Sequence, residues 1–182
     1  MNKVKKNEKV IVKESIIYIK KYFALHDKTA ISINELMSII LNKNFNQNIR
    51  INEKGTLDNI LKKELKYEFI KVYEILKTTL GEMKECIKKI KKLRKVINEF
   101  KIKSITLYSL HTFFNSTLIY FNQDYKLKEK LHESIIHIDE TCENEINRIQ
   151  VIWKETPFLF LILQKFNTNK LIKECEFFLN KA

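Results

Sequence analysis

Nine basic side chains lie close together between residues 84 and 103, and they are the strongest chemical signal in the sequence. Only two acidic residues, Glu85 and Glu99, interrupt them. Lysine ammonium groups bind phosphate oxygens as point charges, without reading a base sequence. The run therefore predicts a surface that docks on nucleic acid or on another acidic partner. Its members are Lys84, Lys88, Lys89, Lys91, Lys92, Arg94, Lys95, Lys101 and Lys103.

Five of these lysines recur at steps of three and four residues, which places side chains on one face of an α-helix. They are Lys84, Lys88, Lys91, Lys92 and Lys95. Stacked like charges cost an isolated helix roughly a few tenths of a kcal/mol per pair, which a bound anion would offset. The run has one arginine and no aromatic residue before Phe100. Because base readout favours arginine and single-strand binding favours aromatic rings, we expect weakly specific contact.

The net charge of +12 is unevenly distributed along the chain. Lys and Arg outnumber Asp and Glu by 14 to six between residues 61 and 103, but acids outnumber bases by six to two between residues 131 and 155. A bias toward AT-rich codons would also raise the lysine count, and it is the alternative explanation of the total. A uniform bias would not polarise neighbouring segments, so the distribution favours a positive surface in the middle of the chain.

An apolar repeat, here called the 83–100 seam, runs through the same segment. Its members step by three and four residues over nearly three heptads: Met83, Cys86, Ile90, Leu93, Ile97 and Phe100. This spacing predicts packing against another helix. With the acidic patch at 133–145 it supports a competing function, a protein–protein interaction or oligomerisation module without nucleic-acid contact. Its interface would use Met83, Ile90, Leu93, Ile97, Glu133, Glu140 and Glu143. In a single folded bundle the seam would be intramolecular, which is the ordinary position of such an apolar stripe.

Catalysis and metal binding have little support. The two glycines, Gly55 and Gly81, cannot form a glycine-rich phosphate loop. No histidine pairs by spacing with a cysteine or serine to suggest a nucleophile. Glu133, His137 and Glu140 would share a helix face, but no second helix carries a matching set of ligands to complete a metal site. We therefore expect no enzymatic activity, no catalytic residue, no cofactor and no metal.

Composition also predicts the compartment. The three cysteines form no C-x-x-C motif, which favours free thiols in a reducing environment. The first residues lack the apolar stretch of a secretory signal. The most apolar segment, 105–121, contains too many polar residues to suit a membrane span, so we expect a buried core helix that includes His111. The predicted location is the cytoplasm, without membrane contact.

The elements that must position these residues are helical. Scarce glycine and a single proline leave few tight turns for a sheet, and apolar residues recur at helical spacing. Ser32 and Glu35 form a capping box with Ile31 as its staple, and Ser104 and Asp124 can cap later helices. The predicted helices are 7–25, 32–42, 57–101, 105–121, 125–155 and 171–179, with a short apolar segment at 158–166 and a loop at 43–55.

We therefore predict an all-α fold, a single helical bundle of six or seven helices that includes two long antiparallel helices at about 57–101 and 125–155. Residues 1–182 form a single domain, or a bundle on which 1–55 pack as a small N-terminal subdomain.

The leading function is a non-catalytic accessory or inhibitor protein that docks through its basic helix. Its partner is RNA or DNA, or a nucleic-acid-processing nucleoprotein complex, and a homodimer is an open alternative. A winged-helix-type DNA binder would instead use helices 32–42 and 56–66, although the loop between them is long for that motif.

Overall fold

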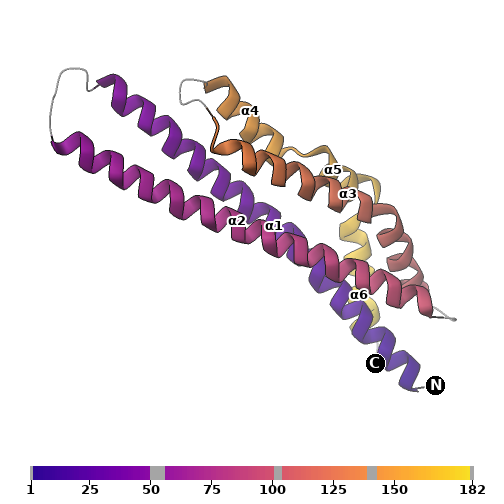
Figure 1. The fold of residues 1–182 in the computed structure, drawn as a ribbon. Helices are drawn as coiled ribbons and strands as arrows, with labels where there is room; N and C mark the ends of the chain where they lie inside the picture. The colour runs from indigo at the N-terminus through magenta and orange to yellow at the C-terminus, as the bar shows by residue number, and fades with distance from the viewer. Residues whose placement is uncertain (1, 50–55, 101–103, 139–142, 181–182) are drawn as a thin grey trace. The chain divides into compact units, whose positions relative to one another are not determined.

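The computed structural model describes residues 2–49, 56–100, 104–138 and 143–180 (Figure 1). These residues are almost entirely helical and include no strand, which confirms the all-α prediction. The five longer helices are α1 (Asn2–Ile49), α2 (Thr56–Glu99), α3 (Ile105–Ile135), α4 (Glu143–Lys154) and α6 (Thr168–Asn180). A single turn, α5 (Pro157–Phe160), and the π-helical η2 (Leu161–Lys165) precede α6. The prediction of six or seven helices was therefore slightly too high.

Helix α1 is one continuous helix where the sequence predicts two. Asp27 and Lys28, predicted to lie in a break after residue 25, are exposed on its outer side. Ser32, the predicted cap of a second helix, is buried within α1, whereas the proposed staple Ile31 is largely exposed. A capping box expresses only a local preference, and burial of a long apolar stripe overrides it.

The predicted loop at 43–55 is also wrong in its first half. Helix α1 continues to Ile49, and residues 50–55 lie outside the described part of the chain. The predicted helix at 57–101 corresponds closely to α2, which runs through Gly81 without interruption.

The beginning of α3 was predicted correctly and its end was not. Ser104 caps the helix, because its Oγ accepts a hydrogen bond from the Leu107 amide at 3.2 Å. Asp124 does not begin another helix but lies inside α3, which continues to Ile135. The long helix predicted at 125–155 is thus the last part of α3 followed by α4, with residues 139–142 outside the described ones.

The chain groups into two compact units. Unit 1 contains residues 1–25, 82–126 and 156–182, and unit 2 contains residues 26–81 and 127–155. Each of the three long helices contributes to both. The prediction of one domain over 1–182, or of a subdomain at 1–55, stays a prediction.

Unit 1 packs parts of α1, α2, α3 and α6 around a shared core. Helix α3 runs back alongside the end of α2 (Figure 1). Helix α6 lies against α1, where Lys20 pairs with Glu176 at 2.7 Å. The buried apolar side chains come from all four helices and include Val12, Ile16, Ile19, Met83, Ile90, Ile97, Leu107, Leu110, Phe114, Leu171 and Cys175.

A buried carboxylate joins three segments of unit 1. Asp124 Oδ2 accepts a hydrogen bond from Tyr22 Oη at 2.7 Å, and Asp124 Oδ1 accepts one from Thr156 Oγ1 at 2.7 Å. Burial, and secondarily the Asp124 charge, raise the pKa of Tyr22 well above its ordinary value. Thr156 also accepts a bond from the Leu159 amide and so caps α5. The carboxylate therefore fixes α1, α3 and the start of α5 together.

Unit 2 has a polar contact of its own between α4 and α1. Trp153 Nε1 donates a hydrogen bond to Thr29 Oγ1 at 3.0 Å, and the Thr29 hydroxyl donates to the His26 carbonyl at 2.7 Å. Trp153 is fully buried. This contact explains why Thr29 faces inward in a helix segment that the sequence predicts to be a connection.

Replacing Asp124 with Ala should lower the free energy of unfolding by about 3 kcal/mol, because the buried Thr156 hydroxyl loses its acceptor and the Tyr22 hydroxyl keeps only the Phe121 carbonyl, 3.1 Å away. Urea unfolding followed by circular dichroism measures the change. Asp27→Ala, an exposed change on α1, is the control and should stay within about 0.5 kcal/mol of the original protein. Equal effects of the two substitutions would contradict the structural role of Asp124.

Gly81→Ala should raise the free energy of unfolding by about 1 kcal/mol, the difference in helix propensity between the two residues. A Cβ atom at this position meets nothing within 4 Å, so no steric cost offsets the gain. Lys66→Ala, at another exposed position of α2, should change stability little. A loss of stability in the Gly81 variant would show that α2 does not run through this position as a regular helix.

Candidate functional site

The 83–100 seam lies inside unit 1. Met83, Ile90 and Ile97 are fully buried, Cys86 and Leu93 are nearly so, and Phe100 is half-buried. Cys86 Sγ contacts the Tyr18 carbonyl of α1 at 3.1 Å, which places α1 over this side of α2. Burial raises the pKa of the Cys86 thiol to about 11. The interface residues predicted on the seam are therefore covered by the chain's own helices.

The lysine face, defined as Lys84, Lys88, Lys91, Lys92 and Lys95, lies on the side of α2 opposite the seam. Each of these side chains is exposed. At about 100° per residue the five positions fall within a sector of roughly 100°, turned away from the buried side. The positions of these lysines on the regular helix α2 agree with the prediction that they share one face.

The other predicted basic residues do not belong to this face. Lys89 is exposed but lies on the flank that also carries Glu82, whose carboxylate pairs with Lys21 of α1 at 3.4 Å. Arg94 is half-buried at the edge of the seam. Lys101 and Lys103 lie outside the described residues.

Only part of the positive charge is neutralised within the chain. Glu85 pairs with Lys88, and this hydrogen bond, followed by the charges of neighbouring lysines, lowers the pKa of Glu85. The Lys84 ammonium lies 5.6 Å from the centroid of the Tyr125 ring on α3, a cation–π distance.

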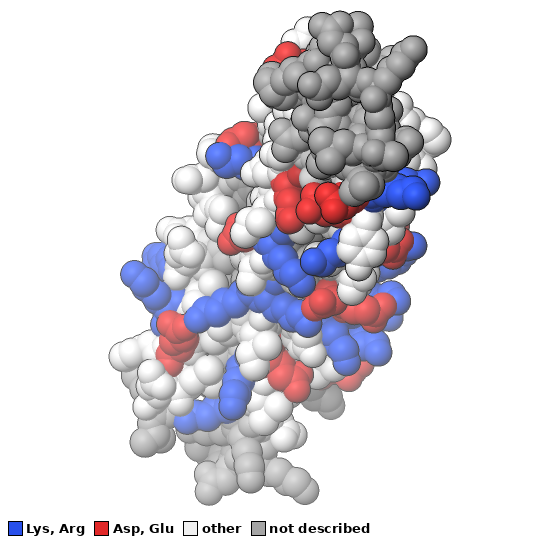
Figure 2. All heavy atoms as spheres, turned by 90° about the vertical axis from the view of Figure 1, so that its left-hand side faces the viewer, with Lys and Arg blue, Asp and Glu red and all other residues white. Residues whose placement is uncertain are grey.

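The other three lysines of the face make no ion pair with any residue that the structure describes: Lys91, Lys92 and Lys95. On the view in Figure 2, basic side chains lie among acidic ones. Exposed lysines that make no ion pair with a described residue also occur elsewhere, for example Lys13, Lys28 and Lys130, so the lysine face is distinguished by the gathering of its charges on one side of α2.

The predicted acidic patch does not form a single helical face. Glu133 is exposed near the end of α3, and Glu143 is exposed in the first turn of α4. Because α3 ends at Ile135, His137 is not on the same helix as Glu133, and Glu140 lies outside the described residues. Acids in the first turn of α4 stabilise the helix dipole, which is a sufficient reason for Glu143. Over the described chain, no group of three His, Cys, Asp or Glu residues could hold a metal.

One histidine lies in a different environment from the one predicted, and another makes a contact that was not predicted. His111, predicted in the core, is only half-buried, and its ring nitrogen Nε2 lies 3.2 Å from the Asn115 amide nitrogen. His132 stacks on Tyr73 in unit 2, with ring centroids 4.2 Å apart. Burial is the main cause that lowers the pKa of His132. No local spacing signals this stack, because its two residues come from different helices.

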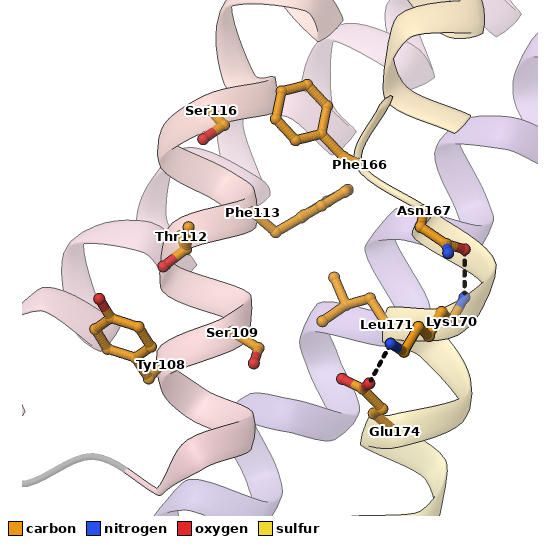
Figure 3. A pocket seen from close by; sticks show the side chains of 10 residues that line it. All are labelled: Tyr108, Ser109, Thr112, Phe113, Ser116, Phe166, Asn167, Lys170, Leu171 and Glu174. Atoms are coloured by element: carbon orange, nitrogen blue, oxygen red, sulfur yellow. Dashed lines mark hydrogen bonds and ion pairs between the residues drawn. The ribbon is translucent and has the colours of Figure 1, made fainter. Parts of the chain in front are cut away.

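A groove of about 360 Å³ lies between α3 and α6 in unit 1 (Figure 3). Phe113, Phe166 and Leu171 project into it. Lys170 and Glu174, on its α6 side, are 4.0 Å apart and balance each other's charge. The groove thus presents apolar and hydroxyl-bearing side chains without a net charge, unlike the lysine face.

No protein-family model matches this chain, and no curated protein matches it. No helix in the described ranges has a stretch that is both long and apolar enough to cross a membrane.

The buried His132 predicts a loss of stability toward acid pH. Its lowered pKa means that the folded protein favours the neutral ring, whereas the unfolded chain binds a proton once the pH falls below about 6.5. The unfolded state then holds more protons, so stability decreases from pH 7.5 to pH values below 6.

The measurement is urea unfolding at several pH values for the original protein and for His132→Phe, which retains an aromatic ring beside Tyr73 but cannot titrate. The variant should lose less stability on acidification than the original protein. The same pH dependence in both would show that His132 is not held neutral.

Proposed function

We propose that this chain is a non-catalytic accessory or inhibitor protein of the cytoplasm that docks through the lysine face of α2 on nucleic acid. Its target is RNA or DNA, either free or exposed within a nucleic-acid-processing complex. The observation that carries the proposal is a set of five exposed lysines on one side of one helix, three of which make no ion pair with a described residue.

Phosphate contact would offset the repulsion among the lysines of the face, which is unfavourable in the protein alone. Like charges three and four residues apart repel, and the buried seam prevents the helix from turning them elsewhere. A phosphate backbone supplies the missing counter-charge, and the binding releases condensed cations into solution. Lysines at successive turns of α2 are about 5–6 Å apart along its axis, so one rigid helix can contact several phosphates together.

The contact is expected to be weakly selective for sequence. The exposed basic side chains of the face are all lysine, which lacks the planar fork with which arginine reads guanine. The face includes no aromatic side chain on which a base could stack. Affinity should therefore follow phosphate density and ionic strength more than base composition.

No observation favours either of the two alternative functions, the protein–protein module or the winged-helix DNA binder. A protein–protein module built on the 83–100 seam would require unit 1 to open, because that seam is buried. A winged-helix arrangement would require a short helix at 32–42, but these residues belong to a helix of 48 residues. The lysine face needs no rearrangement to meet a partner.

Replacing four lysines of the face with glutamate should weaken nucleic-acid binding by more than about 100-fold, because attraction to phosphate becomes repulsion. The variant is Lys88→Glu, Lys91→Glu, Lys92→Glu, Lys95→Glu. Fluorescence anisotropy with labelled single-stranded RNA, single-stranded DNA and duplex DNA at about 50 mM salt measures the dissociation constants. Circular dichroism should show unchanged helicity, since all four side chains are exposed.

A matched control reverses four exposed lysines elsewhere, so that both variants change the net charge equally. It is Lys13→Glu, Lys28→Glu, Lys130→Glu, Lys173→Glu. This control should retain binding within about fivefold, because none of its four lysines belongs to α2 and it leaves all five lysines of the face in place. Unchanged binding of the α2 variant, or an equal loss in both variants, would contradict the proposal.

A further inference from the structure

One side of α3 in unit 1 is exposed and carries no charged side chain. From Ser104 to Gln123 there is no Lys, Arg, Asp or Glu, although these residues make up 31% of the chain. The sequence predicts a buried helix here, but the structure covers only one side of it. On the other side Ile105 is 87% exposed, Tyr108 63% and Ile119 58%. The outer face of a surface helix is normally charged or polar, so this side is suited to being covered.

The exposed positions repeat as in a helix–helix interface. They define the α3 outer face: Ile105, Tyr108, Thr112, Asn115 and Ile119. Their steps of three, four, three and four residues are those of a packed seam. The apolar ends of the face are placed symmetrically, since Ile105 and Ile119 are each seven residues from Thr112. Two antiparallel copies of the face would therefore place Ile105 of one against Ile119 of the other, with Thr112 at the two-fold axis.

Charge favours a second copy of this chain as the occupant. With a net charge of +12, two copies repel each other when basic surfaces meet. The α3 outer face itself carries no charge, and Lys170, which lines the adjoining groove together with Tyr108 and Thr112, is balanced by Glu174 at 4.0 Å. At its centre the small Thr112 allows close approach of two helices, while Tyr108 and Asn115 on either side offer a hydroxyl and an amide for polar contact.

We propose that two copies of the chain associate through the α3 outer face in an antiparallel, two-fold arrangement. The face spans about 21 Å along α3. It is smaller than the roughly 800 Å² per partner of a standard stable interface, so the dimer should be weak, with a dissociation constant on the order of 10–100 µM. The contact uses no residue of the lysine face, and it differs from the seam-based dimer considered above. It therefore stands or falls independently of nucleic-acid binding.

Sedimentation equilibrium over about 5–500 µM provides the first test. The average mass should rise from 21.9 kDa toward twice that value. Ile119→Lys should weaken association at least tenfold, because dimerisation would bury its charge. Ile17→Lys adds the same charge at a half-exposed position of α1 in the same unit and should leave association unchanged. A constant mass of 21.9 kDa in the original protein, or equal effects of the two variants, would overturn the proposal.

A cysteine at the proposed two-fold axis provides the second test. Helix axes 8–10 Å apart with Cα atoms about 2.3 Å from each axis leave about 3.4–5.4 Å between facing Cα atoms, a range that overlaps disulfide geometry. Thr112→Cys should therefore form a disulfide-linked dimer at least tenfold faster than Thr78→Cys, an exposed control on α2. Both variants carry Cys142→Ser, and Cys86 and Cys175 are buried. Equal rates of cross-linking would overturn the antiparallel arrangement.

Discussion

Burial of the 83–100 seam is the constraint that determines which side chains of α2 are exposed to solvent. Met83, Ile90 and Ile97 leave no exposed surface, so the rotation of α2 about its own axis is fixed. Every side chain half a turn away must then face solvent. The lysine face follows from this geometry, and its mutual repulsion cannot be relieved by a turn of the helix.

The buried Asp124 carboxylate has a corresponding role in the remainder of unit 1. It holds the Tyr22 hydroxyl of α1 and the Thr156 hydroxyl that caps α5, and so it sets where the chain re-enters the unit before α6. The groove between α3 and α6 follows from that placement. A polar group that is fully buried and fully bonded fixes neighbours more narrowly than apolar packing does, because displaced partners lose their hydrogen bonds.

Periodic apolar residues made the helical fold and the extent of α2 predictable, and Ser104 correctly marked the beginning of α3. The errors share a physical origin. Ser32 and Asp124 are residue types that cap helices, but both lie inside helices here, and Asp124 bonds to Tyr22, 102 residues away in the sequence. The exposure of Ile105 and Ile119 was equally unpredictable, because composition does not reveal how many neighbours cover a helix. Spacing alone predicted the lysine face, since it required only one regular helix.

The proposed function depends on the lysine face, because this set of side chains on α2 is exposed and largely without counter-charge. The most direct measurement of its role is the dependence of nucleic-acid affinity on salt concentration for the unmodified protein. Contact of about five lysines with phosphates predicts that the logarithm of the association constant falls linearly with the logarithm of salt concentration, with a slope of about −3 to −5. A slope near zero, or no binding at about 50 mM salt, would contradict the account.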